Sequence, residues 1–190
     1  MAISDVAITE RVRMPQEIEI PYLTRPQVEQ RAKEVLKKHG LHSIPVDPVV
    51  LANREGIVVN NAKFSDDNLV GIIAKRGNNV TLLVNQSDPP FRKRFTIAHE
   101  LGHHFLHLLS DGDFVDGDAD LFRLPPESAE EETAKRRQEI QANMFAAALL
   151  MPEEAMREEW RRLRSIEQMA RLFNVSEQAM GFRVDQLRLA

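Results

Sequence analysis

The chain has 190 residues, a formal net charge of -4 and no cysteine. Its length suits one domain with a small appendage, and its slight acidity gives no whole-chain attraction to nucleic acid or to an anionic membrane. Without cysteine, disulfides, thiol catalysis and cysteine-bound zinc are excluded, so a transition metal would be held by imidazole and carboxylate groups. The sequence has no recognisable signal peptide and no apolar run long enough to cross a bilayer, so we expect a cytoplasmic protein with no membrane association.

Hydrophobic spacing, helix caps and turn residues predict the elements of the first half of the chain. Residues 1–23 are expected to form an extended N-terminal arm. Five elements should follow the arm: helices over 24–38 and 47–54, each including its cap, and strands over 57–60, 69–75 and 80–85. The tetrapeptide Arg-Gly-Asn-Asn at 76–79 fits a tight turn, so the last two strands should form a hairpin.

The second half of the chain is expected to be largely helical. The predicted helices cover 91 to about 109, 127–150, 153–163, 166–173 and 176–188. Between the first two of these helices, residues 110–126 are rich in Asp and Gly and should form a loop or a short hairpin around Phe114 and Val115. The order of a helix, a small antiparallel sheet, two long helices and a helical tail predicts an α+β fold.

The helix predicted from residue 91 contains the sequence His-Glu-Leu-Gly-His at 99–103. His99 and His103 lie four residues apart, so both imidazoles face the same side of a helix and can bind one ion. Glu100 lies about 100° further around the helix and can reach a water on the metal without being a ligand. Two imidazoles, a third protein ligand and an open water position are typical of catalytic zinc, with Glu100 as the general base for attack on a peptide carbonyl.

The third metal ligand should come from the second long helix. Glu139 and Asn143 share one face of that helix, so Glu139 could complete the coordination while Asn143 accepts the outer N–H of a ligating histidine. Three alanines at 142, 146 and 147 would let this helix lie close to the histidine helix. The glutamates at 130–132 are competitors for the third position, and Glu132 is the main rival because it shares the face of Glu139 two turns earlier.

Two longer strings make the pattern more specific: RFTIAHELGH at 94–103, and EIQANMFAAALLMP at 139–152. Together they resemble the ImmA/IrrE family of metallopeptidases. The segments FVD at 114–116 and LFR at 121–123 are also similar to the stretch between the two helices in that family. The resemblance extends from about residue 46 to residue 152.

This resemblance implies a zincin-like fold with a small antiparallel sheet packed on the active-site helix. It implies that His99, His103 and Glu139 are the metal ligands and that Glu100 is the general base. The ion implied is Zn2+, with Mn2+ as the alternative, since imidazole and carboxylate ligands suit both. The role implied is cleavage of a helix-turn-helix transcriptional repressor of a phage, mobile element or stress response.

The expected organisation is the arm over 1–23, a metallopeptidase domain over 24–152 and a helical tail over 153–190. The tail resembles a helix-turn-helix, and Gln178, Arg183 and Arg188 lie on its would-be recognition helix. Much of that helix is apolar, so we expect a structural or substrate-docking module and no direct nucleic-acid binding.

Several roles stay open at the level of sequence. His104 and His107 are expected to support the site from behind or to lie at the surface, and His104, Tyr22 and Arg123 are alternative candidates for stabilising an oxyanion. The alternative function is a non-catalytic interaction partner or DNA-binding regulator, of toxin–antitoxin type, that retains a structural metal. Substrate identity and oligomeric state have no signature in the sequence.

Overall fold

The computed structural model of the chain describes residues 22–64, 69–107, 112–116 and 134–190. The expected arm therefore lies almost wholly outside the described residues. The described elements are α1 (Arg25–Lys38), α2 (Pro48–Arg54), β1 (Val58–Ala62), β2 (Gly71–Arg76), β3 (Asn79–Asn85), α3 (Pro90–Leu106), β4 (Gly112–Asp116), α4 (Ala134–Leu150), α5 (Glu153–Leu163), α6 (Ile166–Phe173) and α7 (Glu177–Gln186).

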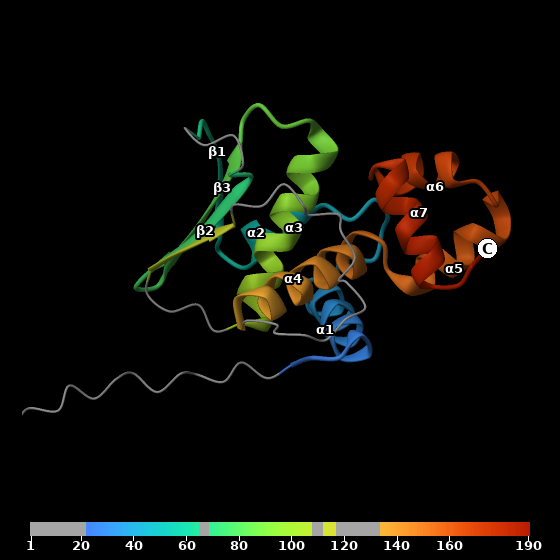
Figure 1. Cartoon of the computed structure of the whole chain (residues 1–190), viewed down its shortest axis with the longest axis horizontal. Coiled ribbons are helices and arrows are strands. Elements are labelled where there is room, and N and C mark those ends of the chain that lie inside the picture. The colour runs from blue at the N-terminus through green and yellow to red at the C-terminus, as the bar shows by residue number, and fades with distance from the viewer. Residues whose placement is uncertain (1–21, 65–68, 108–111, 117–133) are drawn as a thin grey trace, which may run out of the picture.

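These elements confirm the α+β fold class (Figure 1). The sheet lies at one end of the molecule, the helical module α5–α7 lies at the other end, and α3 and α4 cross between them. Helix α1 packs against α4, and α2 packs against α3. Among the described residues, no helix combines the length and the apolar character that crossing a membrane requires.

Local sequence determines where the first two helices begin. Gln27 accepts a hydrogen bond from the backbone N–H of Thr24 at 2.8 Å, which closes the start of α1. Asp47 accepts one from the backbone N–H of Val49 at 2.9 Å, and Pro48 occupies the first helical position of α2. Both predicted caps are confirmed.

The four strands form one sheet in the order β1-β3-β2-β4. β2 and β3 form the expected antiparallel hairpin, whose turn contains Gly77 at a φ of +57°. The sheet is mixed, however, because β1 pairs with β3 in parallel, and it was expected to be antiparallel throughout. β4 pairs with β2 and adds a fourth strand within the segment that was expected to be a loop or a short hairpin.

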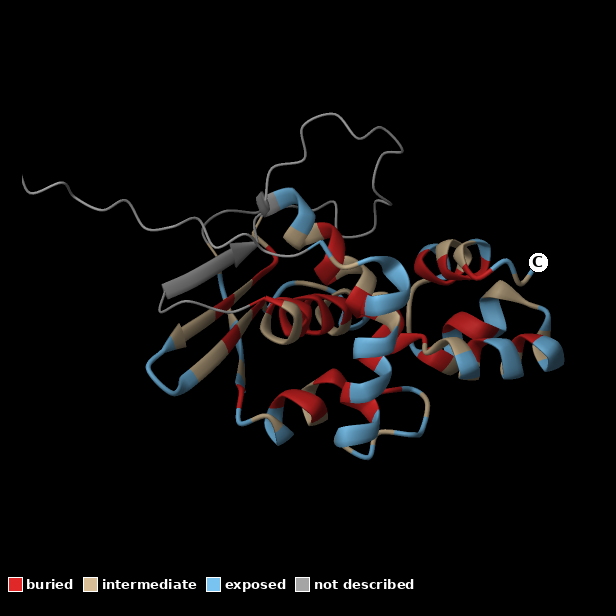
Figure 2. Ribbon diagram, turned by 90° about the horizontal axis from the view of Figure 1, so that it is seen from below, coloured by how far each residue is buried: buried red, intermediate tan, exposed pale blue. Residues whose placement is uncertain are grey.

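The core lies where the inner face of the sheet meets α3 and where α3 meets α4. Ile73 of β2 and Leu82 of β3 face each other in register and are both fully buried. Phe145 of α4 stacks on Phe105 of α3 with ring centroids 5.6 Å apart. Figure 2 shows buried residues gathered along these meeting faces. The histidine helix is therefore held between the sheet and the second long helix.

Candidate metal centre

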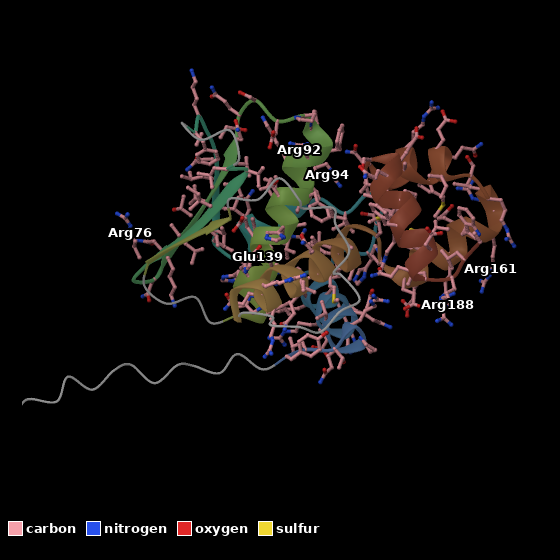
Figure 3. All side chains as sticks on the ribbon, viewed as in Figure 1. Arg76, Arg92, Arg94, Glu139, Arg161 and Arg188 are labelled. Carbon is pink, nitrogen blue, oxygen red and sulfur yellow. The ribbon has the colours of Figure 1, made fainter. Side chains whose placement is uncertain are left out.

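Helices α3 and α4 approach each other very closely at the proposed site. A Cβ atom on Gly102 would lie only 2.9 Å from the Cα atom and 3.0 Å from the carbonyl oxygen of Ala142. The glycine in the His-Glu-Leu-Gly-His sequence and the facing alanine thus allow near backbone contact. This close approach brings Glu139 of α4, which is labelled in Figure 3, within reach of two histidines of α3.

Three side chains converge at this crossing. The Nε2 atoms of His99 and His103 lie 3.0 Å apart, and the Glu139 Oε2 atom lies 3.2 Å from the first and 3.6 Å from the second. Both imidazoles are fully buried, whereas Glu139 is half-buried. Among the described residues, this is the one cluster of three histidine or acidic side chains whose ligand atoms could share an ion.

The cluster has the dimensions and the charge of a cation site. With metal–ligand bonds of about 2.0–2.1 Å, a tetrahedral zinc site has ligand atoms about 3.3 Å from one another, close to the separations seen here. Burial would raise the pKa of Glu139, but the neighbouring imidazoles of His103 and His99 outweigh it and hold that pKa below its usual range. The carboxyl group is therefore ionised, and its Oε1 atom is buried without a hydrogen-bond partner in the described part of the chain.

His99 is oriented from the side opposite the cluster. Its Nδ1 atom lies 2.8 Å from the Oδ1 atom of Asn143, one turn after Glu139 on α4. An amide oxygen only accepts hydrogen bonds, so Nδ1 carries the proton and Nε2 presents a lone pair to the cluster. The predicted contact between Asn143 and a histidine is confirmed.

His103 is oriented by another histidine. Its Nδ1 atom lies 3.2 Å from the Nδ1 atom of His107, whose Nε2 atom lies 3.3 Å from the Oε1 atom of Gln141. Burial, followed by the nearby His103, lowers the pKa of His107 to about 4. The expectation for His107 left open a surface position, but the residue is buried behind the cluster. The role of Gln141 was missed, and its one signal was a place in the string at 139–152.

Glu100 is fully buried, and its side chain lies against the start of β2. A Cβ atom on Gly71 would lie 2.9 Å from the Glu100 Oε1 atom and 2.5 Å from the Cγ2 atom of Thr96. The candidate base is thus packed against the backbone of a glycine, where no side chain intervenes. The sequence gives no sign of this contact, because nothing in it pairs residue 71 with residue 100.

Of the remaining candidates for oxyanion stabilisation and for the third metal ligand, two lie in the described part of the chain and the others do not. His104 turns toward α2, where its Nε2 atom lies 3.7 Å from the Oε2 atom of Glu55, and burial lowers its pKa. Tyr22 is exposed at the start of the described chain. Arg123 and the rival glutamates at 130–132 lie outside the described residues. Neither described candidate for oxyanion stabilisation belongs to the cluster of three ligand atoms.

Comparison with known proteins relates this chain to a family of peptidases. Residues 52–185 match the peptidase family described as the IrrE N-terminal-like domain. Over 99 residues the chain is 34% identical to the radiation response metalloprotease IrrE of Deinococcus radiodurans, an alignment that covers 50% of this chain and 27% of that protein. The chain therefore spans about a quarter of the length of that curated relative.

A solved structure has a similar fold. The chain superimposes on a Mycobacterium tuberculosis transcriptional regulator with a TM-score of 0.57 at 20% sequence identity, over 83% of this chain and 46% of that one. At this identity the likeness concerns the fold alone. The family match covers both helices of the cluster and most of the helical tail. The chain belongs to the ImmA/IrrE family, through its IrrE N-terminal-like peptidase domain.

Proposed function

We propose that this chain is a metal-dependent endopeptidase in which His99, His103 and Glu139 hold one divalent ion and Glu100 is the general base. The observation that carries the proposal is the meeting of two imidazole nitrogens and one carboxylate oxygen, from two different helices, at separations of 3.0, 3.2 and 3.6 Å. Zinc is the ion we expect, and manganese is the alternative, because the ligand types suit both.

When bound, the ion would lower the pKa of a water molecule and polarise the carbonyl of the bond to be cut. Glu100 would accept a proton from the attacking water and deliver it to the nitrogen of the leaving peptide. Asn143 would keep the Nε2 lone pair of His99 directed at the ion through its contact with Nδ1. The burial of Glu100 keeps bulk water away from the proton that it transfers.

The proposed substrate is a regulatory protein, a helix-turn-helix transcriptional repressor of a phage, mobile element or stress response. The support comes from the family, since the curated relative is a radiation response metalloprotease. An extended segment of the substrate would pair with a strand edge of the sheet, whose outer strands are β1 and β4.

Within the chain, we propose residues 24–152 as the catalytic unit and residues 153–190 as a structural or substrate-docking module. Acidic and basic side chains are equal in number over 153–190, so the module has no excess charge to attract DNA. Arg183, a candidate base-reading residue, is buried and paired with Glu29 of α1. DNA affinity that falls with salt and is unchanged in Glu100→Gln would favour the alternative of a DNA-binding regulator.

The proposal is tested by metal analysis of the purified protein and by incubation with any helix-turn-helix repressor encoded beside it, with cleavage followed by mass spectrometry. Glu100→Gln should retain the metal and lose cleavage, because the amide cannot take the proton. His103→Ala should lose both. Full cleavage by Glu100→Gln would refute the assignment of the base, and a repressor that is bound but never cut would favour the non-catalytic interaction partner.

A further inference from the structure

The two histidines of the cluster are held from behind in different ways. The outer nitrogen of His99 faces an amide oxygen, which is a simple acceptor. The outer nitrogen of His103 faces the Nδ1 atom of a second imidazole, that of His107, at 3.2 Å. An imidazole nitrogen is either a donor or an acceptor, so the state of His103 depends on the state of its neighbour.

Gln141 resolves this ambiguity. Its Oε1 atom can only accept, and it lies 3.3 Å from the Nε2 atom of His107, so that nitrogen carries a proton. In a neutral His107 the Nδ1 atom then has the lone pair and accepts the N–H of His103. The Nε2 atom of His103 is left with its own lone pair facing His99 and Glu139.

We propose that His107, supported by Gln141, is a positioning residue that fixes His103 in the tautomer able to bind a metal through Nε2. The inference rests on the proposed metal site and adds a chain of two hydrogen bonds behind it. His107 is 5% exposed and Gln141 is 1% exposed, so bulk water does not replace either partner. Both ring nitrogens of His107 take part in these hydrogen bonds, so His107 is not a fourth metal ligand.

A matched pair of variants separates this role from simple packing. In His107→Asn the side-chain oxygen can take the place of the Nδ1 acceptor, whereas His107→Leu has a similar size and no acceptor. Partners behind metal-bound histidines are typically worth about 10- to 100-fold in metal affinity. We expect His107→Leu to weaken zinc binding by about this factor and His107→Asn to keep most of the affinity.

Zinc affinity is measured by competition with a chromophoric chelator, independently of cleavage. His104→Asn and His104→Leu serve as the control pair, because His104 is close in sequence but faces Glu55 and takes no part in the hydrogen bonds that link His103, His107 and Gln141. Equal loss in both His107 variants, or no loss in His107→Leu, would overturn the proposal. Failure of the wild-type protein to bind zinc would instead refute the proposed metal site.

Two further measurements test the two hydrogen bonds that link Gln141, His107 and His103. Gln141→Leu should weaken zinc binding in the wild-type background and have no further effect in His107→Leu, as a double-mutant cycle requires of partners acting through one another. Nitrogen NMR of the zinc-loaded wild-type protein should find His107 protonated at Nε2 and unprotonated at Nδ1. A proton on Nδ1 of His107 would overturn the proposal even if the variants did not fold.

Discussion

Gly71 occupies the first position of β2, where the strand passes α3. A methyl group at this position would meet the Thr96 Cγ2 atom at 2.5 Å and the Glu100 Oε1 atom at 2.9 Å, both shorter than ordinary contacts. The Thr96 side chain is β-branched and fully buried, so it cannot turn away at low cost. Strain at this position would therefore be transmitted to the carboxylate of Glu100.

Gly71→Ala should thus impair catalysis while leaving the three metal ligands intact. A displacement of a catalytic group by about 1 Å can lower the rate by about 100-fold, so we expect kcat to fall by up to that factor. Zinc content, measured by atomic emission, should equal that of the wild-type protein.

Gly181→Ala is the matched control, because among the described residues no atom lies within 4 Å of the added methyl group apart from the adjoining residues and the backbone of its own helix. This helical substitution should preserve kcat and stabilise the protein by up to about 1 kcal/mol. Unchanged kcat in Gly71→Ala would show that the strand does not position the base.

The crossing of the two long helices brings the three proposed metal ligands together. Gly102 of α3 lies close to the backbone of Ala142 of α4, and the three proposed ligands come from these two helices. Interiors are close-packed, so a side chain inserted here must separate the two backbones. The distance between the two helices therefore determines how far Glu139 lies from His99 and His103.

Gly102→Ala should cost both stability and metal affinity. Overpacking typically lowers the free energy of unfolding by about 1–3 kcal/mol, and here the obstacle is backbone, which a rotamer change cannot clear. Moving α4 away also moves Glu139 away from His99 and His103. Urea denaturation and zinc competition measure the two effects, and retention of both quantities at wild-type level would contradict this account of the crossing.

Features that depend on local sequence patterns could be predicted, whereas contacts between segments far apart in the sequence could not. Periodicity and caps predicted the helices within a few residues, except that the start predicted for the second long helix, at 127, lies outside the described residues. The spacing of His99 and His103 predicted their shared face. β4 was not predicted as a strand of the sheet, because its pairing with β2 brings together segments far apart in the chain. The parallel pairing of β1 with β3 and the contact between Gly71 and Glu100 are tertiary for the same reason.

Binding of an ion at the proposed site should be coupled to folding of the entire molecule. The proposed ligands come from α3 and α4, so they meet only in the folded chain. A ligand that binds only the folded state stabilises it by about 2.7 kcal/mol at a concentration 100 times its Kd.

Zinc should therefore raise the Tm of the protein, and a chelator should reverse the effect in a thermal melt. Glu139→Ala should abolish most of this response while still folding, because the alanine removes one of the three ligands from a half-buried position. An equal zinc-induced shift in Glu139→Ala would indicate that the ion binds elsewhere.

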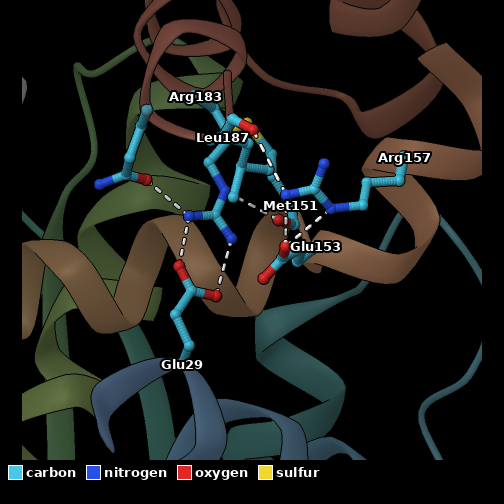
Figure 4. A network of polar contacts seen from close by, with 7 residues as sticks. Glu29, Met151, Glu153, Arg157, Arg183 and Leu187 are labelled. Carbon is cyan, nitrogen blue, oxygen red and sulfur yellow. Dashed lines mark hydrogen bonds and ion pairs between the residues drawn. The ribbon is translucent and has the colours of Figure 1, made fainter. Parts of the chain in front are cut away.

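Two arginines, Arg94 and Arg183, connect the helical tail to the rest of the molecule. Arg94 of α3 donates to the carbonyl oxygens of Asn174, at 3.1 Å, and Val46, at 2.6 Å. Arg183 of α7 donates to Glu29 of α1 through two hydrogen bonds of 2.5 and 2.8 Å and to the carbonyl oxygen of Met151 at 3.1 Å (Figure 4). These contacts explain why a helix that resembles a DNA reader from its sequence directs a key arginine inward.

The pair of Arg183 and Glu29 should dominate the attachment of the tail. The Arg183 side chain is 1% exposed, and its partner is 20% exposed. Removing one partner of a buried ion pair costs about 3–5 kcal/mol, so Glu29→Gln should cost roughly 2–4 kcal/mol because some solvent reaches this site. The double variant Glu29→Leu with Arg183→Met should recover most of that loss, since no charge is left buried.

Glu153→Gln is the control. It breaks the neighbouring pair with Arg157, in which both side chains are 43% exposed, and should cost less than about 1 kcal/mol. Equal losses for Glu29→Gln and Glu153→Gln in urea denaturation would mean that burial of Arg183 does not hold the tail in place.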